Sequence, residues 1–327
     1  MTHEKLFDAM ETVSKIAHRT PFKQSSTLNK WTGGKVFMKL ENLQKTGSFK
    51  LRGAYYKVSN LNMIEAKKDV IAASAGNHAQ GLALSCSLSG IKSKIFMPKS
   101  APMPKIEAVK SYGAEVVLEG ENYQAAYEAA RKEEQRNGGV FVHAFDDPDV
   151  IAGQSTVALE MLQQNPDLQT IVVPVGGGGL LAGISLAVKM IRPDIRVVGV
   201  QSANASAVVQ GFTGNSKTAL TRCSTIADGI AVVKPGELTV PIISKYVDEM
   251  VTVTEEQIAF AMMFMLEREK MVVEGAGAAS LAAVLFHRNL AVDQSVGLII
   301  SGGNVDPQKW SFYKEMADKL NVMKRIS

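Results

Sequence analysis

One lysine of this chain, Lys50, stands in a setting that would suit covalent catalysis. It lies in the stretch ENLQKTGSFKLRGA (residues 41–54), after a Gly-Ser-Phe hinge and directly before a segment with helical spacing. Burial lowers the pKa of a lysine, and the neutral amine can then attack a carbonyl carbon or remove a proton. A lone lysine is, however, far more often a solvated surface charge. The segment by itself leaves both roles open.

A run of glycines, Gly176 to Gly179, follows an apolar strand in VGGGGLLAG (residues 175–183) and precedes a helix-like segment. Consecutive glycines let backbone N–H groups approach a phosphate, and a helix N-terminus adds positive potential. The run is not a Walker loop, because no Gly-Lys-Ser/Thr follows it, and it matches the dinucleotide fingerprint weakly. Gln201 and Ser202 follow the next strand, where a dinucleotide site wants an acid for the ribose. The run predicts a monophosphate site, with a tight turn that binds nothing as the alternative.

Two more turns carry polar side chains at the ends of expected strands. SAGNHAQG (residues 74–81) places Ser74, Asn77 and His78 beside the exposed N–H groups of a helix start, which suits a carboxylate. A capped helix start without a ligand is an equally good interpretation of this turn alone. SGGN (residues 301–304) places Ser301 at the crevice where open α/β sheets bind ligands.

The elements that must position these turns alternate between strands and helices. Short apolar runs predict one series of strands at 70–74, 94–98, 115–118 and 140–145, and a second at 171–175, 197–200 and 297–301. Helix-like segments separate them, and repeated β-α units imply parallel, right-handed wound sheets. We therefore expect an α/β protein of two open wound lobes, with the change of lobe near Asp146-Asp147-Pro148.

Composition excludes several classes of function. The formal net charge is +4, from 36 basic and 32 acidic residues, so no strong field for nucleic acid or an anionic membrane is expected. Cys86 and Cys223 form no C-x-x-C pair, which indicates neither a disulfide framework nor a cysteine metal site. The first residues lack the apolar stretch of a signal peptide, and no apolar run reaches bilayer length. A cytoplasmic enzyme is the expectation.

The ordered motifs GSFK, SAGNHAQG, DDPDVIAGQ, GGGGL, TIADG, VVEGAGA and IISGGN together resemble the fold-type II pyridoxal-phosphate (PLP) enzymes. The resemblance is to the threonine dehydratase and serine racemase branch and covers nearly the whole chain. It implies a tryptophan synthase β-like fold with PLP in the cleft between the lobes. We expect residues 1–45 and 147–327 to form a large, discontinuous PLP-binding domain and residues 46–146 a small one.

By that resemblance Lys50 forms the Schiff base with PLP and later removes the Cα proton of the substrate. Asn77 would face the ring hydroxyl, and Ser301 would meet the pyridine nitrogen. The substrate carboxylate would be held by Ser74, Asn77 and His78. The full set of expected cofactor contacts is Phe49, Lys50, Asn77, Gly176, Gly177, Gly178, Gly179, Leu180 and Ser301.

A serine at the pyridine nitrogen lacks the negative charge of an aspartate, so the ring is a weaker electron sink, which suits β-elimination. The expected reaction converts L-threonine to 2-oxobutyrate and ammonia, and also L-serine to pyruvate. Serine racemases carry a second serine, which protonates the opposite face of Cα, where this chain has Ala75, and a substrate-contacting serine where it has Val232. Their divalent-cation carboxylates fall at Gln201 and Ala207, so no metal site is expected.

Other possibilities stay open. A serine racemase with dehydratase side activity is one alternative, and an inactive PLP-binding protein is another. A dinucleotide oxidoreductase is disfavoured by the missing ribose acid. Positions that bind nucleotide at the dimer interface of mammalian serine racemase correspond to Lys45, Thr46, Gln80, Tyr112 and Asn304, which implies a nucleotide effector. A homodimer or homotetramer is the expected assembly.

Overall fold

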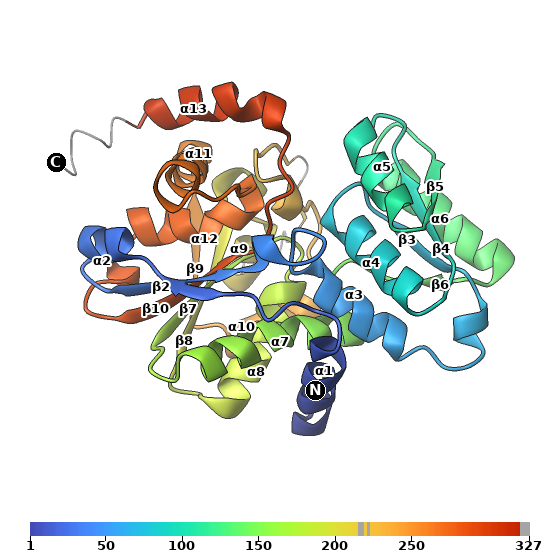
Figure 1. The fold of residues 1–327 in the computed structure, drawn as a ribbon, viewed down its shortest axis with the longest axis horizontal. Coiled ribbons are helices and arrows are strands. Elements are labelled where there is room, and N and C mark those ends of the chain that lie inside the picture. The colour runs from blue at the N-terminus through green and yellow to red at the C-terminus, as the bar shows by residue number, and fades with distance from the viewer. Residues whose placement is uncertain (215–218, 221–222, 321–327) are drawn as a thin grey trace.

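The computed structural model describes residues 1–214, 219–220 and 223–320, and its strands form two sheets (Figure 1). The larger sheet has six strands in the order β1-β2-β10-β7-β8-β9. Its neighbours are parallel except for β1 against β2. Its strands are β1 (Phe22–Gln24), β2 (Lys35–Leu40), β7 (Thr170–Pro174), β8 (Arg196–Ser202), β9 (Glu249–Val253) and β10 (Ser295–Ile300).

The smaller sheet has four strands in the order β5-β4-β3-β6 and is parallel throughout. Its strands are β3 (Val70–Ala73), β4 (Ser93–Met97), β5 (Glu115–Leu118) and β6 (Val140–Phe141). Figure 1 shows it grouped with α4, α5 and α6 on one side of the molecule, apart from the larger sheet. The two sheets confirm the predicted α/β class with open, wound, largely parallel sheets.

Helices cover the sheets, and shorter helical turns connect some of the elements. The helices are α1 (His3–Ser14), α2 (Ser26–Thr32), α3 (Lys50–Ser59), α4 (Asn77–Leu88), α5 (Met103–Ser111), α6 (Tyr123–Asn137), α7 (Pro148–Gln164), α8 (Gly179–Ile191), α9 (Ala207–Phe212), α10 (Thr239–Tyr246), α11 (Glu255–Phe264), α12 (Gly275–Phe286) and α13 (Trp310–Asp318). The short turns are Glu41–Leu43, Glu65–Lys67, Ala203–Ala205, Asp228–Ile230, Met265–Glu269, Arg288–Leu290 and Pro307–Lys309. Within the described ranges, no helix combines the length and apolarity that crossing a bilayer would need.

The core of the larger sheet follows the alternation of side chains along its strands. Val172 and Leu298 belong to an apolar cluster that includes α12, while Ile171 and Ile299 belong to a cluster on the other face that includes α7 and α8. Successive side chains of a strand point to opposite faces, so a parallel sheet covered on both faces reads as a continuous apolar run. This is why β7 and β10 were recognisable in the sequence.

One expected strand is much shorter in the structure. The run 140–145 predicts six strand residues, but β6 ends at Phe141. The Nδ1 atom of His143 accepts hydrogen bonds from the N–H groups of Phe145, at 3.3 Å, and Asp146, at 2.9 Å. These side-chain bonds compete with the strand ladder and turn the backbone away from the sheet. Residues 143–146, here called the connecting turn, lead into α7.

Candidate active site

The loops that carry the predicted site residues follow the carboxyl ends of β2, β3, β7 and β10. Ser301 directly follows β10, and its backbone oxygen accepts a 3.1 Å hydrogen bond from the N–H of Phe49. A bridge between Ser48 and Gly302 reinforces this contact. The Gly-Ser-Phe hinge is therefore attached to the SGGN turn, and Phe49 and Ser301 are 252 residues apart in the chain. This attachment brings Lys50 and Ser301 to one place, at the edge where wound sheets bind ligands.

Lys50 is the first residue of α3, and its amine is turned into the protein rather than into solvent. The Nζ atom donates a 2.9 Å hydrogen bond to the backbone oxygen of Ala144 and lies 5.2 Å from the centre of the Phe49 ring. Burial lowers the pKa of Lys50 to about 8, although the nearby Glu274 carboxylate opposes the shift. A fraction of the Lys50 amine is therefore neutral near physiological pH and can act as a nucleophile or a base. This excludes the interpretation of Lys50 as an ordinary solvated surface charge.

The glycine run forms the N-terminus of α8. Gly178 precedes the helix with φ of +100°, a conformation that side chains with a Cβ rarely adopt. The Thr239 hydroxyl donates a 2.7 Å hydrogen bond to the oxygen of Gly177. Among the residues that the structure describes, none accepts a hydrogen bond from the backbone N–H groups of residues 176–180. Buried N–H groups are almost always paired, so this set indicates an anion site.

Asn77 is held at both ends of its side-chain amide. Its Nδ2 donates to Glu274 Oε1 at 2.7 Å, and its Oδ1 accepts from Asn304 Nδ2 at 2.8 Å. Asn304 also donates to the oxygen of Thr46 at 2.9 Å. Because an amide nitrogen has two N–H groups, Asn77 keeps one donor for a ligand. Burial raises the pKa of Glu274 to about 7, against the lowering effect of the Asn77 hydrogen bond.

The other two residues of the substrate turn lie beside Asn77. The Ser74 hydroxyl accepts a 3.2 Å hydrogen bond from the N–H of Gly76, which shapes the turn. His78 directs its Nε2 to the backbone oxygen of Val142, at 3.1 Å, and burial lowers its pKa to about 3. Its ring is therefore neutral, with the proton on Nε2. His78 can serve an anion through its backbone N–H at the start of α4 rather than through a charged ring.

The five expected effector positions are only partly brought together. Thr46 and Asn304 are hydrogen-bonded to each other, as described above. Lys45 is exposed, Gln80 is buried in α4, and Tyr112 follows α5. For these three side chains the described part of the chain supplies no hydrogen bond that would join them to the other two.

Buried charges fix the orientation of α3. The fully buried Arg52 donates to Glu41 Oε2 at 2.8 Å and to Glu160 Oε1 at 2.7 Å. Lys39 donates to Glu160 Oε2 at 2.5 Å, so two cations face two anions. Charge-assisted pairs of this kind are short and directional. They tie the helix that begins with Lys50 to β2 and α7.

Some residues of the site had no role in the sequence analysis. Glu274 stood inside the quoted motif VVEGAGA, but nothing in the sequence indicated that its carboxylate reaches Asn77. Ala144 contributes only a backbone oxygen, which no side-chain pattern reveals. Phe145 packs on the glycine run: a Cβ added to Gly177 would lie 2.3 Å from its ring. The motif DDPDVIAGQ begins at Asp146, one residue after Phe145, and so does not include this phenylalanine.

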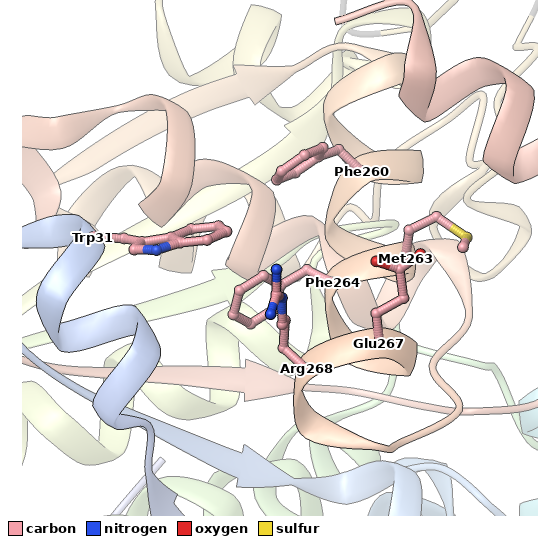
Figure 2. A pocket seen from close by; sticks show the side chains of 6 residues that line it. All are labelled: Trp31, Phe260, Met263, Phe264, Glu267 and Arg268. Atoms are coloured by element: carbon pink, nitrogen blue, oxygen red, sulfur yellow. The ribbon is translucent and has the colours of Figure 1, made fainter. Parts of the chain in front are cut away.

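Two surface cavities lie away from this site. The groove in Figure 2 lies between Trp31 of α2 and Phe260 and Phe264 of α11, and its volume of about 30 Å³ suits roughly one water molecule. A larger hollow of about 460 Å³ lies beside α13 and is lined by Asn204, Thr225, Asp228, Glu255 and Tyr313, among others. Neither is lined by Lys50 or by the glycine run.

Comparisons with known proteins agree with this geometry. Residues 13–302 match the family model described as pyridoxal-phosphate dependent enzyme. An L-threonine ammonia-lyase of Thermotoga maritima is 48% identical over 306 residues, which cover 94% of this chain and 76% of the relative. The processed form of threonine deaminase isoform 2 from Solanum lycopersicum superimposes with a TM-score of 0.93 at 33% identity, covering 98% of this chain and 90% of that one.

Maize serine racemase superimposes with a TM-score of 0.89 at 33% identity, covering 98% of both chains. The family model spans residues 13–302, which include all the motifs named above except the last two residues of SGGN. The chain therefore belongs to the family of pyridoxal-phosphate-dependent enzymes, in the fold-type II branch of threonine dehydratases and serine racemases that its motifs predicted.

Proposed function

We propose that this enzyme catalyses the PLP-dependent β-elimination of L-threonine to 2-oxobutyrate and ammonia, and of L-serine to pyruvate and ammonia. The observation that carries the proposal is the desolvated amine of Lys50, with a pKa of about 8, beside the SGGN turn. The identity to a threonine ammonia-lyase over 94% of the chain supports the choice of substrate. A proton acceptor of this kind is what removal of a Cα proton requires.

The residues present fit PLP. The N–H groups of residues 176–180 have no acceptor among the described residues, and they would hold the phosphate at the N-terminus of α8. Phe49 and Lys50 would lie at the ring, Asn77 has one N–H free for its hydroxyl, and Ser301 lies at the end of β10 for its nitrogen. Bound PLP would supply the electron sink for the carbanion formed at Cα.

The protein's own part in the reaction is positioning and proton transfer. The Ser74 hydroxyl and the backbone N–H groups of Asn77 and His78 would hold the substrate carboxylate at the start of α4, where the helix favours an anion. The Ala144 oxygen holds the Lys50 amine, which takes the Cα proton; the β-hydroxyl takes up a proton and leaves as water. The enamine released then hydrolyses to the 2-oxo acid and ammonia. The methyl of Val232 lies beside Gly176, within 3.3 Å of a Cβ built there, and suits the threonine methyl group.

Serine racemase activity is the second candidate, because a serine racemase shares the fold over 98% of this chain. Ala75, in the turn that carries Asn77, has no hydroxyl that could protonate the second face of Cα. The elimination therefore ranks first. An inactive PLP-binding protein ranks third, because Lys50, Asn77 and Ser301 are all in place.

The remaining features are proposals of the same kind. Residues 1–45 and 147–327 would form the large domain and 46–146 the small one, since strands of the smaller sheet lie only within residues 70–141. The free thiols of Cys86 and Cys223 suit a reducing cytoplasm.

A homodimer or homotetramer is proposed, and the contact between Thr46 and Asn304 supports a nucleotide effector. Titration of ATP and AMP against kcat and KM tests the effector.

The first experiment is an absorbance spectrum of the purified protein, followed by L-threonine and L-serine in the same cuvette. Lysine-bound PLP absorbs near ~410 nm as a property of the cofactor, and 2-oxo acid release is coupled to NADH loss. A yellow protein that turns over threonine faster than serine, without D-serine, supports the proposal. Faster release of D-serine than of 2-oxo acid would select the racemase, and a yellow but inert protein would select the binding protein.

A further inference from the structure

The connecting turn, residues 143–146, touches both halves of the proposed site. On one side the oxygen of Ala144 accepts the hydrogen bond from Lys50 Nζ. On the other side Phe145 packs against the glycine run, since a Cβ added to Gly179 would lie 2.8 Å from its backbone oxygen. A change in this turn would therefore displace the lysine amine and the predicted phosphate site together.

The turn also supports the loop beneath the glycine run. Asp146 accepts hydrogen bonds from the N–H groups of Glu237 and Leu238, each at 2.9 Å. Helix α10 begins directly after this loop with Thr239, whose hydroxyl donates to the oxygen of Gly177. Asp146 thus reaches the glycine run indirectly, through a second set of hydrogen bonds.

A single imidazole holds the turn in this shape. His143 Nδ1 accepts both the Phe145 and the Asp146 N–H groups, so the proton of the ring is on Nε2. The ring also packs edge-on against Phe145, with centroids 4.5 Å apart. Burial lowers the pKa of His143, which keeps the Nδ1 lone pair available as an acceptor.

We propose that His143 is a positioning residue, which fixes the connecting turn through its Nδ1 atom and thereby places the Lys50 amine and the glycine run for PLP. The inference rests on the proposed function in that it takes PLP as the ligand. It assigns His143 no contact with substrate or cofactor, because it acts through Ala144, Phe145 and Asp146. The proposal requires only that a hydrogen-bond acceptor atom lie at the position of His143 Nδ1.

The test compares two amide substitutions whose acceptors fall at different places. The Oδ1 of the H143N variant falls near the position of Nδ1, whereas the Oε1 of H143Q falls near that of Nε2. The dissociation constant of PLP is measured by titrating apoprotein, with thermal unfolding measured in parallel. H287L is the matched control, since the one side-chain hydrogen bond of His287 among the described residues is to the Thr252 oxygen, outside the site.

We expect the dissociation constant of PLP for H143N to lie within ~3-fold of the wild-type value, and that for H287L to equal it. H143Q and H143L should bind PLP at least ~10-fold more weakly than wild type. A tenfold change corresponds to ~1.4 kcal/mol. Rescue by Asn but not Gln separates an acceptor from a merely structural ring, and this comparison holds even where H143L does not fold. Equal affinities of H143N and H143Q, or unchanged affinity of H143L, would overturn the inference alone. A wild-type protein that does not bind PLP would overturn the proposed function as well.

Discussion

The Nζ atom of Lys50, at the start of α3, donates a 2.9 Å hydrogen bond to the backbone oxygen of Ala144, 94 residues later in the chain. A carbonyl oxygen accepts from an amine whether or not the amine is protonated, so the contact survives the loss of a proton. The lysine is therefore held in one place in both of the states that an acid-base role requires. Its environment, and not its position alone, distinguishes it from the exposed lysines of the chain.

Replacement of Lys50 should remove activity and change the pH dependence of stability. We expect K50M to lower kcat by at least ~10³-fold, as loss of a covalent and proton-transferring group does. Elimination assays on holoenzyme check this, with K132M as an exposed control. Residual activity above a tenth of wild type would exclude Lys50 as the base.

The stability effect of the same variant follows from its pKa. The native pKa of about 8 lies below the ordinary 10.5, so between these values the unfolded chain binds more protons than the native one. Wild-type apoprotein should therefore gain stability as the pH rises from 8 to 10.5, while K50M should not. Below pH 8 we expect K50M to be more stable than wild type by roughly 2 kcal/mol. This figure is the free energy that corresponds to the pKa shift of Lys50, reduced because solvent partly screens the charge. Urea unfolding at pH 7 and at the highest pH that the fold tolerates measures the difference.

Ala75 should decide between elimination and racemisation. An A75S variant places a hydroxyl in the turn that begins α4, where a second-face proton donor is missing. We expect D-serine formation from L-serine to rise at least ~10-fold, since a positioned general acid contributes ~10²–10⁴-fold. Chiral chromatography of the products measures it, with A79S, buried on the same helix, as the control. A wild-type protein that already forms D-serine rapidly would refute this role of Ala75.

Glu274 should contribute a titration near neutrality. Its native pKa of about 7 exceeds the ordinary 4.5, so between these values the native state binds more protons than the unfolded one, and stability falls as the pH rises. The E274Q variant lacks this loss of stability, and the side-chain oxygen of its glutamine can still accept the hydrogen bond from Asn77. Above pH 7 we expect E274Q to exceed wild type by roughly 2 kcal/mol, with no difference below pH 4.5.

The same variant should flatten the inflection near pH 7 in the pH profile of kcat/KM. Thermal unfolding and initial rates from pH 4 to 9 check both effects. E315Q, on the exposed side of α13, is the control, and it should follow wild type throughout. A pH profile that E274Q leaves unaltered would remove Glu274 from the site.

Arg52 should be essential for stability because it is buried among charges. R52M would leave Glu41 and Glu160 with Lys39 as their remaining cation. Removing one partner of a buried ion pair costs about 3–5 kcal/mol, so we expect a loss of that size in the free energy of unfolding. R192M, which breaks an exposed pair with Asp194, should cost less than ~1 kcal/mol. Equal effects of the two variants would contradict the role of the buried network.

Much of this protein was determined by local sequence. Apolar runs such as 171–175 and 297–301 predicted strands because both faces of a parallel sheet are buried, and the structure has β7 and β10 there. The glycines before α8 and the turn before α4 predicted anion sites because helix N-termini expose N–H groups. The strand expected at 140–145 failed after Phe141, because a side chain, His143, took over the backbone N–H groups.

Only the tertiary structure decided how these pieces act together. The pKa of Lys50 depends on burial and on Glu274, and its amine is held by the backbone oxygen of Ala144; none of these is visible in residues 41–54. Asn77 is oriented by Glu274 and Asn304, which are distant in sequence. Hydrogen bonds and desolvation depend on distances in space, whereas sequence patterns report only the periodicity and the chain-local geometry of each element. The sequence therefore determined the elements and the chemical groups, and the fold determined their charge states and their partners.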